Sequence, residues 1–412
     1  MSDKRTKLHK TADNSLQISI RGLWRIDKIL NPEGANARVA EQVVTMKPAR
    51  LILVGGFLGA GKTTLLVQAA GRLFREGKRV GVITNDQSAE LVDSALLRQK
   101  GFDVAEVSGG CFCCHFNELA GAIEQLACDH CPDVIFAEPV GSCTDLSATV
   151  LQPLKSFYAN SLVVAPFSVL VDPSLLRECP EVSTAGSFSH DIDYIVHKQM
   201  EEADLLVVNK IDRLGQEERG NLMNWVSARF GQARTVHLSA LSGEGVDQWL
   251  KLVSTSGPAG RRVVDVNYDR YAEGEAALGW LNATVQLRAA LAINWKQFCS
   301  DLLTEVEREI RNQSGTIAHV KLLLNGADGY VLGNVTCPAG SQPRIQGEVG
   351  TTAEEVLLVF NARAQIDSDR LYSIFERALR RTAGPMTEIN VITMTNFSPA
   401  RPRPTHRFNH VV

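Results

Sequence analysis

The chain has 412 residues, of which 44% are hydrophobic and 22% charged, and its formal net charge is −3. This length predicts two domains with additional residues at the ends. The charge shows no basic excess and no stretch approaches about 18 uninterrupted apolar residues, so we expect no nucleic-acid partner and no membrane span. Nine cysteines, an odd number, and the lack of a signal-like apolar run in the first thirty residues favour a cytoplasmic protein with reduced thiols.

Residues 1–47 are predicted to form an extension ahead of the first domain. Apolar side chains lie close together between Leu23 and Leu30 in this stretch. They could pack on a domain or bind a partner, and the sequence favours neither.

A phosphate-binding loop follows the first predicted strand, 51–54. In "GGFLGAGKTT", four residues separate Gly56 from Gly61, and Lys62-Thr63 follow, between a strand and a helix. The glycines let backbone N–H groups face the phosphates, Lys62 brings a positive charge to the β and γ oxygens, and the Thr63 hydroxyl can bind Mg²⁺. The nucleotide-binding residues predicted here are Gly56, Gly59, Ala60, Gly61, Lys62, Thr63 and Thr64.

Three cysteines lie within four positions in "SGGCFCCHF", after a predicted strand at 104–107. Thiolates are soft ligands that suit Zn²⁺ and can also hold Co²⁺, Ni²⁺ or Cu⁺. In a straight strand Cys111 and Cys113 would face one side and Cys114 the other, so they converge only if the chain bends, which the two preceding glycines allow. A site in which only one or two of them bind metal and a redox pair are the alternatives.

A fourth metal ligand has two candidates. His115 directly follows the cysteines, and Cys143 follows the next predicted strand, 133–137, at the same edge of the sheet. The sequence "CDHC" at 128–131 comes instead after a predicted helix, 117–127, that leads away from this edge. We therefore expect it to be a structural loop.

Glu138 ends the strand 133–137 and is followed by Pro-Val-Gly. The carboxyl ends of parallel strands face the ligand in open α/β sheets. Glu138 is therefore suited to hold Mg²⁺ or to orient the attacking water, and the Gly141 N–H can approach the γ-phosphate.

The stretch "DLLVVNKID", at 204–212, is a further predicted strand that ends in Asn-Lys-x-Asp. A carboxylate at Asp212 can accept hydrogen bonds from N1 and N2 of guanine, which adenine cannot offer, and such a site discriminates by roughly 10⁴-fold. The predicted base-binding residues are Asn209, Lys210, which would flank the purine, Asp212, Ser239 and Ala240, the last two next to guanine O6. This pattern favours GTP over ATP.

Beyond a predicted linker at 256–278, the order β-α-β-β-β-α predicts a C-terminal α+β domain, ferredoxin-like in outline, over 279–395. A P-loop domain at 48–255 with a mostly parallel sheet precedes it. Residues 396–412 are rich in proline and arginine and are predicted to be a flexible tail. His406 and His410 in this tail are weaker metal-ligand candidates.

Taken together, these motifs resemble the CobW/HypB/UreG class of P-loop GTPases, and within it the CobW-like branch. The likeness covers roughly 50–250 through "GGFLGAGKTTLL", "GGCFCC", "AEPVG", "HKQMEEADLLVVNKID" and "LSALSGEG". It implies GTP-dependent metal delivery or metalloenzyme maturation, a metal-ligand role for Cys111, Cys113 and Cys114, and an appended α+β domain. The branch typically has Asn-Glu and then Gly in a switch that contacts nucleotide and metal, where this chain has Asn85-Asp86-Gln87-Ser88. Asp86 keeps the charge but is one methylene shorter, so the resemblance implies a nucleotide contact by Asp86 and a different coupling between nucleotide and metal.

The resulting hypothesis is a slow GTPase that acts as a metallochaperone or cofactor-insertion protein, with GTP or GDP, Mg²⁺ and a transition metal, Zn²⁺ ahead of Co²⁺ or Ni²⁺. The predicted catalytic residues are Lys62, Thr63, Glu138 and Asp86. No arginine finger is evident, so we expect intrinsic hydrolysis on the order of 10⁻⁴ to 10⁻² s⁻¹. Expected partners are a client metalloenzyme or cofactor-dependent enzyme and, in one nucleotide state, a second copy of the chain.

Two other functions fit the same motifs. One is a GTP-dependent activator or reactivator of a cobalamin-linked or other metalloenzyme, in which the cysteines carry no metal. The other is a P-loop kinase of a small molecule, which would require ATP to outcompete GTP. Metal binding and nucleotide preference separate the three.

Overall fold

The computed structural model describes residues 48–85, 92–178, 188–255, 257, 259–336, 342–350 and 354–412. The predicted extension at 1–47 and Asp86 lie outside these residues. No helix within the described ranges is long and apolar enough to cross a membrane.

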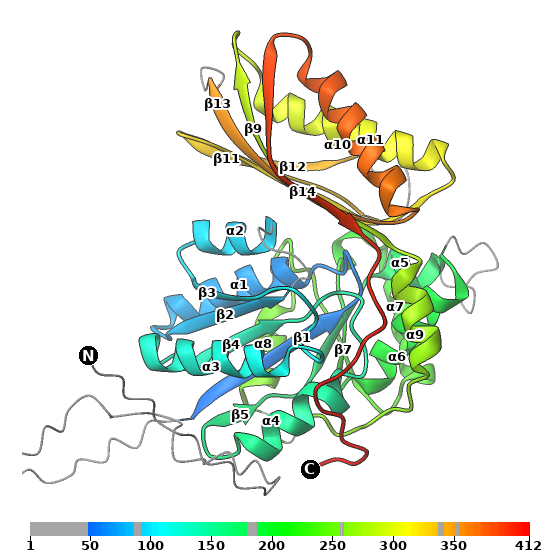
Figure 1. Cartoon of the computed structure of the whole chain (residues 1–412). Coiled ribbons are helices and arrows are strands. Elements are labelled where there is room, and N and C mark those ends of the chain that lie inside the picture. Colours follow the sequence, from blue (N-terminus) through cyan, green and yellow to red (C-terminus); the bar gives the residue numbers. More distant parts are fainter. Residues whose placement is uncertain are drawn as a thin grey trace, which may run out of the picture. The chain divides into compact units, whose positions relative to one another are not determined.

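The P-loop domain is built on an eight-stranded sheet in which all paired strands are parallel (Figure 1). Leu51, Leu53 and Val54 are fully buried, because helices cover both faces of the sheet and no side of the strand meets water. The order is β3 (Asp103–Val107), β2 (Val80–Asn85), β4 (Val134–Glu138), β1 (Ala49–Gly56), β6 (Ser168–Val171), β7 (Leu205–Val208) and β8 (Arg234–His237), with β5 (Leu162–Val164) also paired to β1.

Two apolar layers hold the helices on this sheet. One layer contains α1 (Lys62–Arg75), α8 (Val246–Thr255) and Leu97 of α2 (Val92–Gln99). The other contains α3 (Phe116–His130), a π-helical turn (Ser147–Leu151), α4 (Gln152–Phe157), α5 (Pro173–Glu178), α6 (His190–Glu202), α7 (Gln216–Arg229) and α9 (Tyr268–Ala276). Helix α9 falls inside the stretch predicted to be a linker, and its Tyr271 is fully buried in this second layer.

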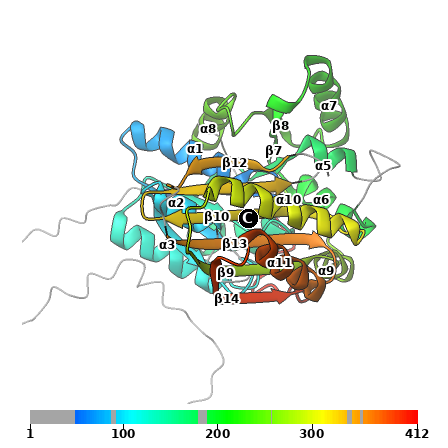
Figure 2. The same cartoon turned by 90° about the horizontal axis from the view of Figure 1, so that it is seen from above.

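The C-terminal domain is a six-stranded antiparallel sheet with two helices on one face (Figure 2). The strands are β9 (Gly279–Ala289), β10 (Thr316–Gly326), β11 (Gly329–Thr336), β12 (Arg344–Glu348), β13 (Glu355–Gln365) and β14 (Thr387–Phe397), and the helices are α10 (Trp295–Asn312) and α11 (Ser368–Ala383). Strands β10-β13-β9-β14 with both helices form the predicted ferredoxin-like arrangement, to which β11 and β12 add one edge.

Local sequence signals account for the helices of this domain better than for its strands. Helix α11 is capped by Asp367, which accepts hydrogen bonds from the backbone N–H groups of Asp369 and Arg370. Strands β12 and β14 escaped prediction. Both are edge strands that expose most of their residues, so neither shows the alternation of apolar and polar positions that marks a half-buried strand.

The second face of the C-terminal sheet packs on the P-loop domain. Val92 of α2 contacts Leu323 and Val359 in a small apolar cluster, and its backbone N–H donates to Asn361 Oδ1 at 3.0 Å. Side chains alternate along β10, so Val320, Leu322 and Leu324 join the core under the helices while Leu323 faces the P-loop domain.

The end of the chain follows a defined course over the P-loop domain, although its composition predicted a flexible tail. Figure 1 shows it in red, leaving β14 and ending at the C-terminus. The Phe408 N–H donates to Ala148 O at 3.0 Å, and the Val412 N–H donates to Gln152 Oε1 at 2.9 Å. Arg407 Nε lies 2.7 Å from Asp145 Oδ2, a carboxylate that is 1% exposed. Backbone hydrogen bonds and one shielded ion pair thus hold a segment that has little apolar surface.

Candidate functional site

The phosphate loop has the backbone that its glycines predict. Gly56 has φ 123°, and a Cβ there would lie 2.3 Å from Leu170 O, so neither the conformation nor the space admits a side chain. Helix α1 begins at Lys62 with no side-chain cap, which leaves its first N–H groups open to an anion. The Lys62 Nζ donates to Gly56 O at 2.9 Å, and burial lowers the pKa of this lysine. A phosphate would offer this buried cation a stronger partner.

A hydroxyl and a carboxylate, those of Thr63 and Glu138, lie beside the loop. Thr63 Oγ1 donates to Glu138 Oε1 at 3.0 Å, while Glu138 Oε2 is buried and has no hydrogen-bond partner. Burial, and then the negative charge of Asp93, raise the pKa of Glu138 to about 7. A hydroxyl and a carboxylate oxygen without a partner suit a hard divalent cation, so these residues fit the predicted Mg²⁺.

The predicted base-binding residues meet the phosphate loop at the same pocket. Asn209 Nδ2 donates to Ala60 O at 2.7 Å, and Asn209 Oδ1 accepts from the Ala240 N–H at 2.9 Å. Asn209 therefore ties the loop to the strand that carries the base motif. Ser239 Oγ donates to Asp212 Oδ1 at 2.6 Å, which orients the carboxylate, and Gly141 and Lys210 also line this pocket.

The three cysteines of the motif converge. Their Sγ atoms lie 2.8 Å apart for Cys111 and Cys113, 3.2 Å for Cys111 and Cys114, and 3.7 Å for Cys113 and Cys114. A turn rather than a strand brings them together, since the N–H groups of Cys114 and His115 both donate to Cys111 O. Among the described residues, this is the one group of three or more metal-ligating side chains gathered within 4.8 Å.

The geometry of this thiol cluster suits a soft metal. Sulfurs bound to Zn²⁺ at about 2.3 Å in a tetrahedron lie roughly 3.8 Å apart, so the observed spacings require shifts of about 1 Å or less. Hydrogen bonding with Cys113 and then with Cys114 holds the pKa of the Cys111 thiol well below its ordinary value. This shift favours loss of the Cys111 proton, which metal binding requires.

The other candidate ligands are placed differently. Cys143 is 1% exposed and lies near enough to influence the pKa of both Cys111 and Cys113, so it borders the cluster, although it is not in the group gathered within 4.8 Å. His115 lies against Gly110, where a Cβ would meet its Nε2 at 2.3 Å, and its Nδ1 lies 3.6 Å from a Glu118 oxygen. His130 lies 3.3 Å from Asp103, at the start of β3 and away from the cluster. Cys143 is thus the better placed fourth thiol.

The two tail histidines pack rather than ligate. The His406 ring makes edge contacts with Phe116 and Phe157, at centroid distances of 5.0 and 5.2 Å. The His410 ring lies 6.1 Å from Phe408. Neither belongs to the described metal-ligating group.

The tail lies directly over the thiol cluster. The Arg403 N–H donates to Cys114 Sγ at 3.2 Å, and the Thr405 N–H and hydroxyl donate to Cys113 O and Cys114 O, each at 2.8 Å. Nothing in the local sequence predicted this contact, because almost 290 positions separate the partners.

Asn85 contacts both the pocket and the thiol cluster. It ends β2 and lines the nucleotide pocket. Its Nδ2 donates to Val107 O at 2.9 Å and to Gly110 O at 2.7 Å, and its Oδ1 accepts from the Phe112 N–H at 2.8 Å. One buried amide thus fixes the turn on both sides of Cys111 from within the pocket wall.

Several residues in or beside the pocket carried no site assignment from the sequence. Asp172 follows β6 and accepts a hydrogen bond from Lys210, a position at a strand's carboxyl end that the topology rule could have found. Asp93 lies on α2 near Thr63. Lys321 and Arg344 come from the C-terminal sheet, and no motif marks them.

A buried carboxyl group lies behind the thiol cluster. Glu275 of α9 is 1% exposed and accepts a hydrogen bond from Ser142 Oγ at 2.6 Å. Burial, and then the nearby Cys111, raise its pKa from 4.5 to about 8. At neutral pH this side chain is therefore mostly protonated in the folded, metal-free protein.

We expect the Glu275→Gln variant to remove part of the pH dependence of stability. Between pH 4.5 and 8 the folded state keeps a proton that the unfolded state has lost, so the free energy of unfolding falls as pH rises through this window. Urea unfolding of metal-free protein at pH 5.5 and 7.5 should show a decline about 2–3 kcal/mol larger for wild type than for the variant. Glu273→Gln, exposed on the same helix, should behave like wild type.

The sequence of this chain is similar to those of known nucleotide-binding and metal-handling proteins. Residues 50–237 match the family model described as CobW/HypB/UreG, nucleotide-binding domain. Zinc chaperone YeiR of Escherichia coli (strain K12) is 28% identical over 195 residues, 46% of this chain and 54% of YeiR. Zinc chaperone CobW of Pseudomonas aeruginosa is 28% identical over 218 residues, 44% of this chain and 55% of CobW.

A eukaryotic relative extends this set. Zinc-regulated GTPase metalloprotein activator 1 of Dictyostelium discoideum is 33% identical over 103 residues, 22% of this chain and 21% of that protein. The chain therefore spans about half the length of the two bacterial relatives and less of this one.

Proposed function

We propose that this chain, whose residues 50–237 match the nucleotide-binding domain of the CobW/HypB/UreG family, is a GTP-hydrolysing metallochaperone of the CobW-like branch. In this proposal the thiol cluster carries Zn²⁺ as cargo, and the nucleotide state sets how tightly the metal is held. Co²⁺ and Ni²⁺ are cargoes that the same thiolates could bind.

One observation carries the proposal: Asn85 belongs to the wall of the nucleotide pocket and also holds the turn that gathers the cysteines. A change of phosphate state that moves Asn85 would move Gly110 and Phe112, and with them the sulfur atoms between. Coupling of this kind requires an element shared by both sites.

The predicted nucleotide-site residues have different roles in hydrolysis under this proposal. Lys62 neutralises the β- and γ-phosphate oxygens, and the N-terminus of α1 supplies N–H donors. Thr63 and Glu138 would hold Mg²⁺, which would supply positive charge to stabilise the negative charge on the phosphates. Gly141 borders the expected position of the γ-phosphate, and Asp212 selects guanine. With no arginine finger supplied, turnover would be slow and suited to a switch.

We propose Cys143 as the fourth thiol of the metal site, since it already borders Cys111 and Cys113. Four thiolates make a closed structural type of zinc site, whereas three leave a position open for transfer. Delivery to a client metalloenzyme would then use exchange of one thiolate for a client ligand. A cytoplasmic setting with reduced thiols is part of the same proposal.

The test is zinc affinity measured by chelator competition on the full chain, with Mg²⁺ and either the β,γ-imido analogue of GTP or GDP. We expect affinities that differ by about 5- to 150-fold between the two nucleotides. Cys111→Ser, Cys113→Ser and Cys114→Ser combined should abolish stoichiometric zinc binding. Cys128→Ser, exposed and outside the cluster, should leave it unchanged.

Equal zinc affinity in both nucleotide states would contradict the proposed coupling. Retention of stoichiometric zinc by the triple variant would contradict the metal site. If the triple variant instead lost zinc and still turned over GTP and activated a client, the protein would be an activator whose action does not depend on carried metal.

A further inference from the structure

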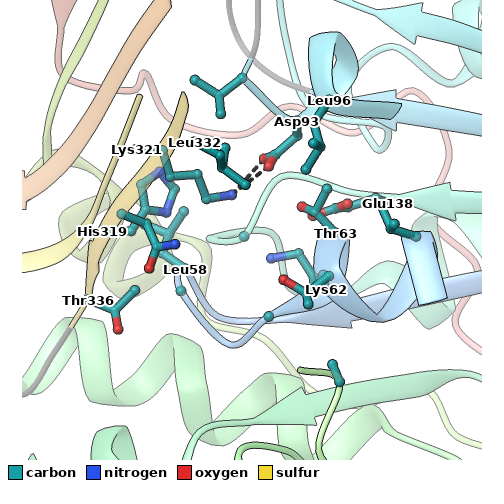
Figure 3. A pocket seen from close by; sticks show the side chains of 18 of the residues that line it. Leu58, Lys62, Thr63, Asp93, Leu96, Glu138, His319, Lys321, Leu332 and Thr336 are labelled. Atoms are coloured by element: carbon teal, nitrogen blue, oxygen red, sulfur yellow. Dashed lines mark hydrogen bonds and ion pairs between the residues drawn. The ribbon is translucent and has the colours of Figure 1, made fainter. Parts of the chain in front are cut away.

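Two polar side chains of the C-terminal sheet, His319 and Lys321, line the nucleotide pocket (Figure 3). They lie two positions apart on β10 and so share one face of the strand, opposite the apolar Val320 and Leu322. The strand also lies close to the phosphate loop, because a Cβ added at Gly59 would lie 3.0 Å from Ala318 O. A polar pair on a strand of another domain therefore closes the pocket over the loop.

Lys321 lies at the phosphate end of the pocket rather than the base end. Its Nζ binds both carboxylate oxygens of Asp93, at 2.8 and 2.7 Å. Burial lowers the pKa of Lys62, the charge of Glu138 raises it, and the positive charge of Lys321 lowers it, so the two lysines lie close enough to repel each other. Figure 3 shows Lys321, Asp93, Thr63 and Glu138 around the space above Lys62.

The base end is lined by different residues of the C-terminal domain. Arg344 Nη2 lies 3.9 Å from Asp212 Oδ2, and Lys210 Nζ donates to Thr336 Oγ1 at 3.5 Å. The sheet therefore spans the whole nucleotide site, with β10 placed over the phosphates and β11 and β12 over the base.

His319 has a ring nitrogen that lacks a partner. The side chain is 8% exposed, and its Nδ1 is buried without a hydrogen bond. Burial, and then Lys321, hold the pKa of the imidazole well below its ordinary value, so the ring is neutral. A neutral imidazole can donate one N–H, and leaving a buried polar nitrogen unpaired is costly unless a ligand pairs it.

We propose that Lys321 and His319 bind the terminal phosphate of the nucleoside triphosphate, so that the C-terminal domain distinguishes GTP from GDP. The inference rests on the proposed GTP site and adds the residues that read its phosphate state. With the triphosphate bound, the γ-phosphate replaces Asp93 as the main partner of Lys321 and accepts a hydrogen bond from His319. Once the γ-phosphate is gone, Lys321 returns to Asp93.

The two states place different demands on the domain interface. The pair with Asp93 links β10 to α2, which follows the segment after Asn85. When Lys321 binds the phosphate, α2 loses its ion pair with β10, while β10 stays at the pocket. Hydrolysis would thus change the contacts of both the C-terminal domain and α2.

The Lys321→Ala variant of the full chain tests this with two ligands, the β,γ-imido analogue of GTP and GDP, each with Mg²⁺. We expect the analogue to bind about 10-fold more weakly, the usual size for a lost hydrogen bond to a charged group, and GDP affinity to stay within about 2-fold. His319→Ala should act in the same direction with a smaller effect, and Lys321→Arg should restore most of the analogue's affinity.

GDP binding itself reports that the variant pocket is folded. Lys296→Ala is the matched control, because this lysine lies on the same domain and pairs with Glu348 outside the pocket. An unchanged ratio of analogue to GDP affinity in Lys321→Ala, with both bound normally or both weakened, overturns the inference. Failure of the wild-type chain to bind GTP would instead contradict the proposed function, so the two failures are distinguishable.

Discussion

Asp212→Asn is expected to shift the preference of this protein away from GTP by up to roughly 10⁴-fold. The wild-type carboxylate can accept two hydrogen bonds, which match N1–H and the 2-amino group of guanine. An asparagine offers one acceptor and one amide donor, so the donor would face the guanine 2-amino group. Xanthine has a carbonyl oxygen at that position, and we therefore expect xanthosine triphosphate to gain what GTP loses.

The surroundings of Asp212 make this substitution interpretable. Its carboxylate accepts from Ser239 Oγ at 2.6 Å, and the side chain is 25% exposed in the ligand-free pocket, so an amide can replace it without a cavity. The measurement is competition of GTP, ATP and xanthosine triphosphate for a fluorescent nucleotide. Asp247→Asn, 86% exposed on α8, is the control and should keep the wild-type order.

Two results would contradict the assignment of the base site. An Asp212→Asn chain that still preferred GTP would show that another group reads guanine. If the wild-type chain preferred ATP, the assignment of a guanine site would be wrong, and the result would support the small-molecule kinase hypothesis.

Deleting residues 401–412 is expected to speed zinc dissociation from the thiol cluster by about 10- to 100-fold, the range seen when groups that support metal ligands are removed. The deletion removes the N–H donor to Cys114 Sγ and both contacts of Thr405 with the motif backbone. An N–H bonded to a thiolate spreads its negative charge and fixes its direction. Without these contacts Cys114, already partly exposed, would open to water and to competing ligands.

A finer pair of variants separates the hydrogen bond from the fold of the tail. Arg403→Pro removes the N–H that reaches Cys114, whereas Arg403→Ala keeps it and removes only the side chain. We expect faster zinc transfer to a chelator, and faster thiol modification of the metal-free protein, in the proline variant alone. If the two variants and the truncated chain all transferred zinc at the wild-type rate, the result would contradict the proposal that the tail protects the site.

The contiguous motifs of this protein were readable from the sequence because their chemistry is local. The phosphate loop needs glycines at fixed offsets before a helix, and the base motif needs its asparagine and aspartate at the end of a strand. The structure brings both motifs to one pocket and gathers Cys111, Cys113 and Cys114 at the same edge of the sheet. The helix at 117–127 and the buried strands that precede these motifs were predictable for the same reason, since apolar runs and periodicity are properties of neighbouring residues.

Contacts between distant residues were decided only by the tertiary structure. Lys321 reaches Asp93 across 228 positions, and Arg403 reaches Cys114 across 289. Neither the lysine on a strand nor the proline- and arginine-rich tail carries a pattern that names its partner. The stretch predicted as a linker contains Glu275 for a related reason: its helix is short and polar, and only the shape of the surface left by α6 and the thiol turn makes a buried place for it. The apolar periodicity of a helix or strand shows which of its sides is buried, but it does not show which part of the protein packs against that side.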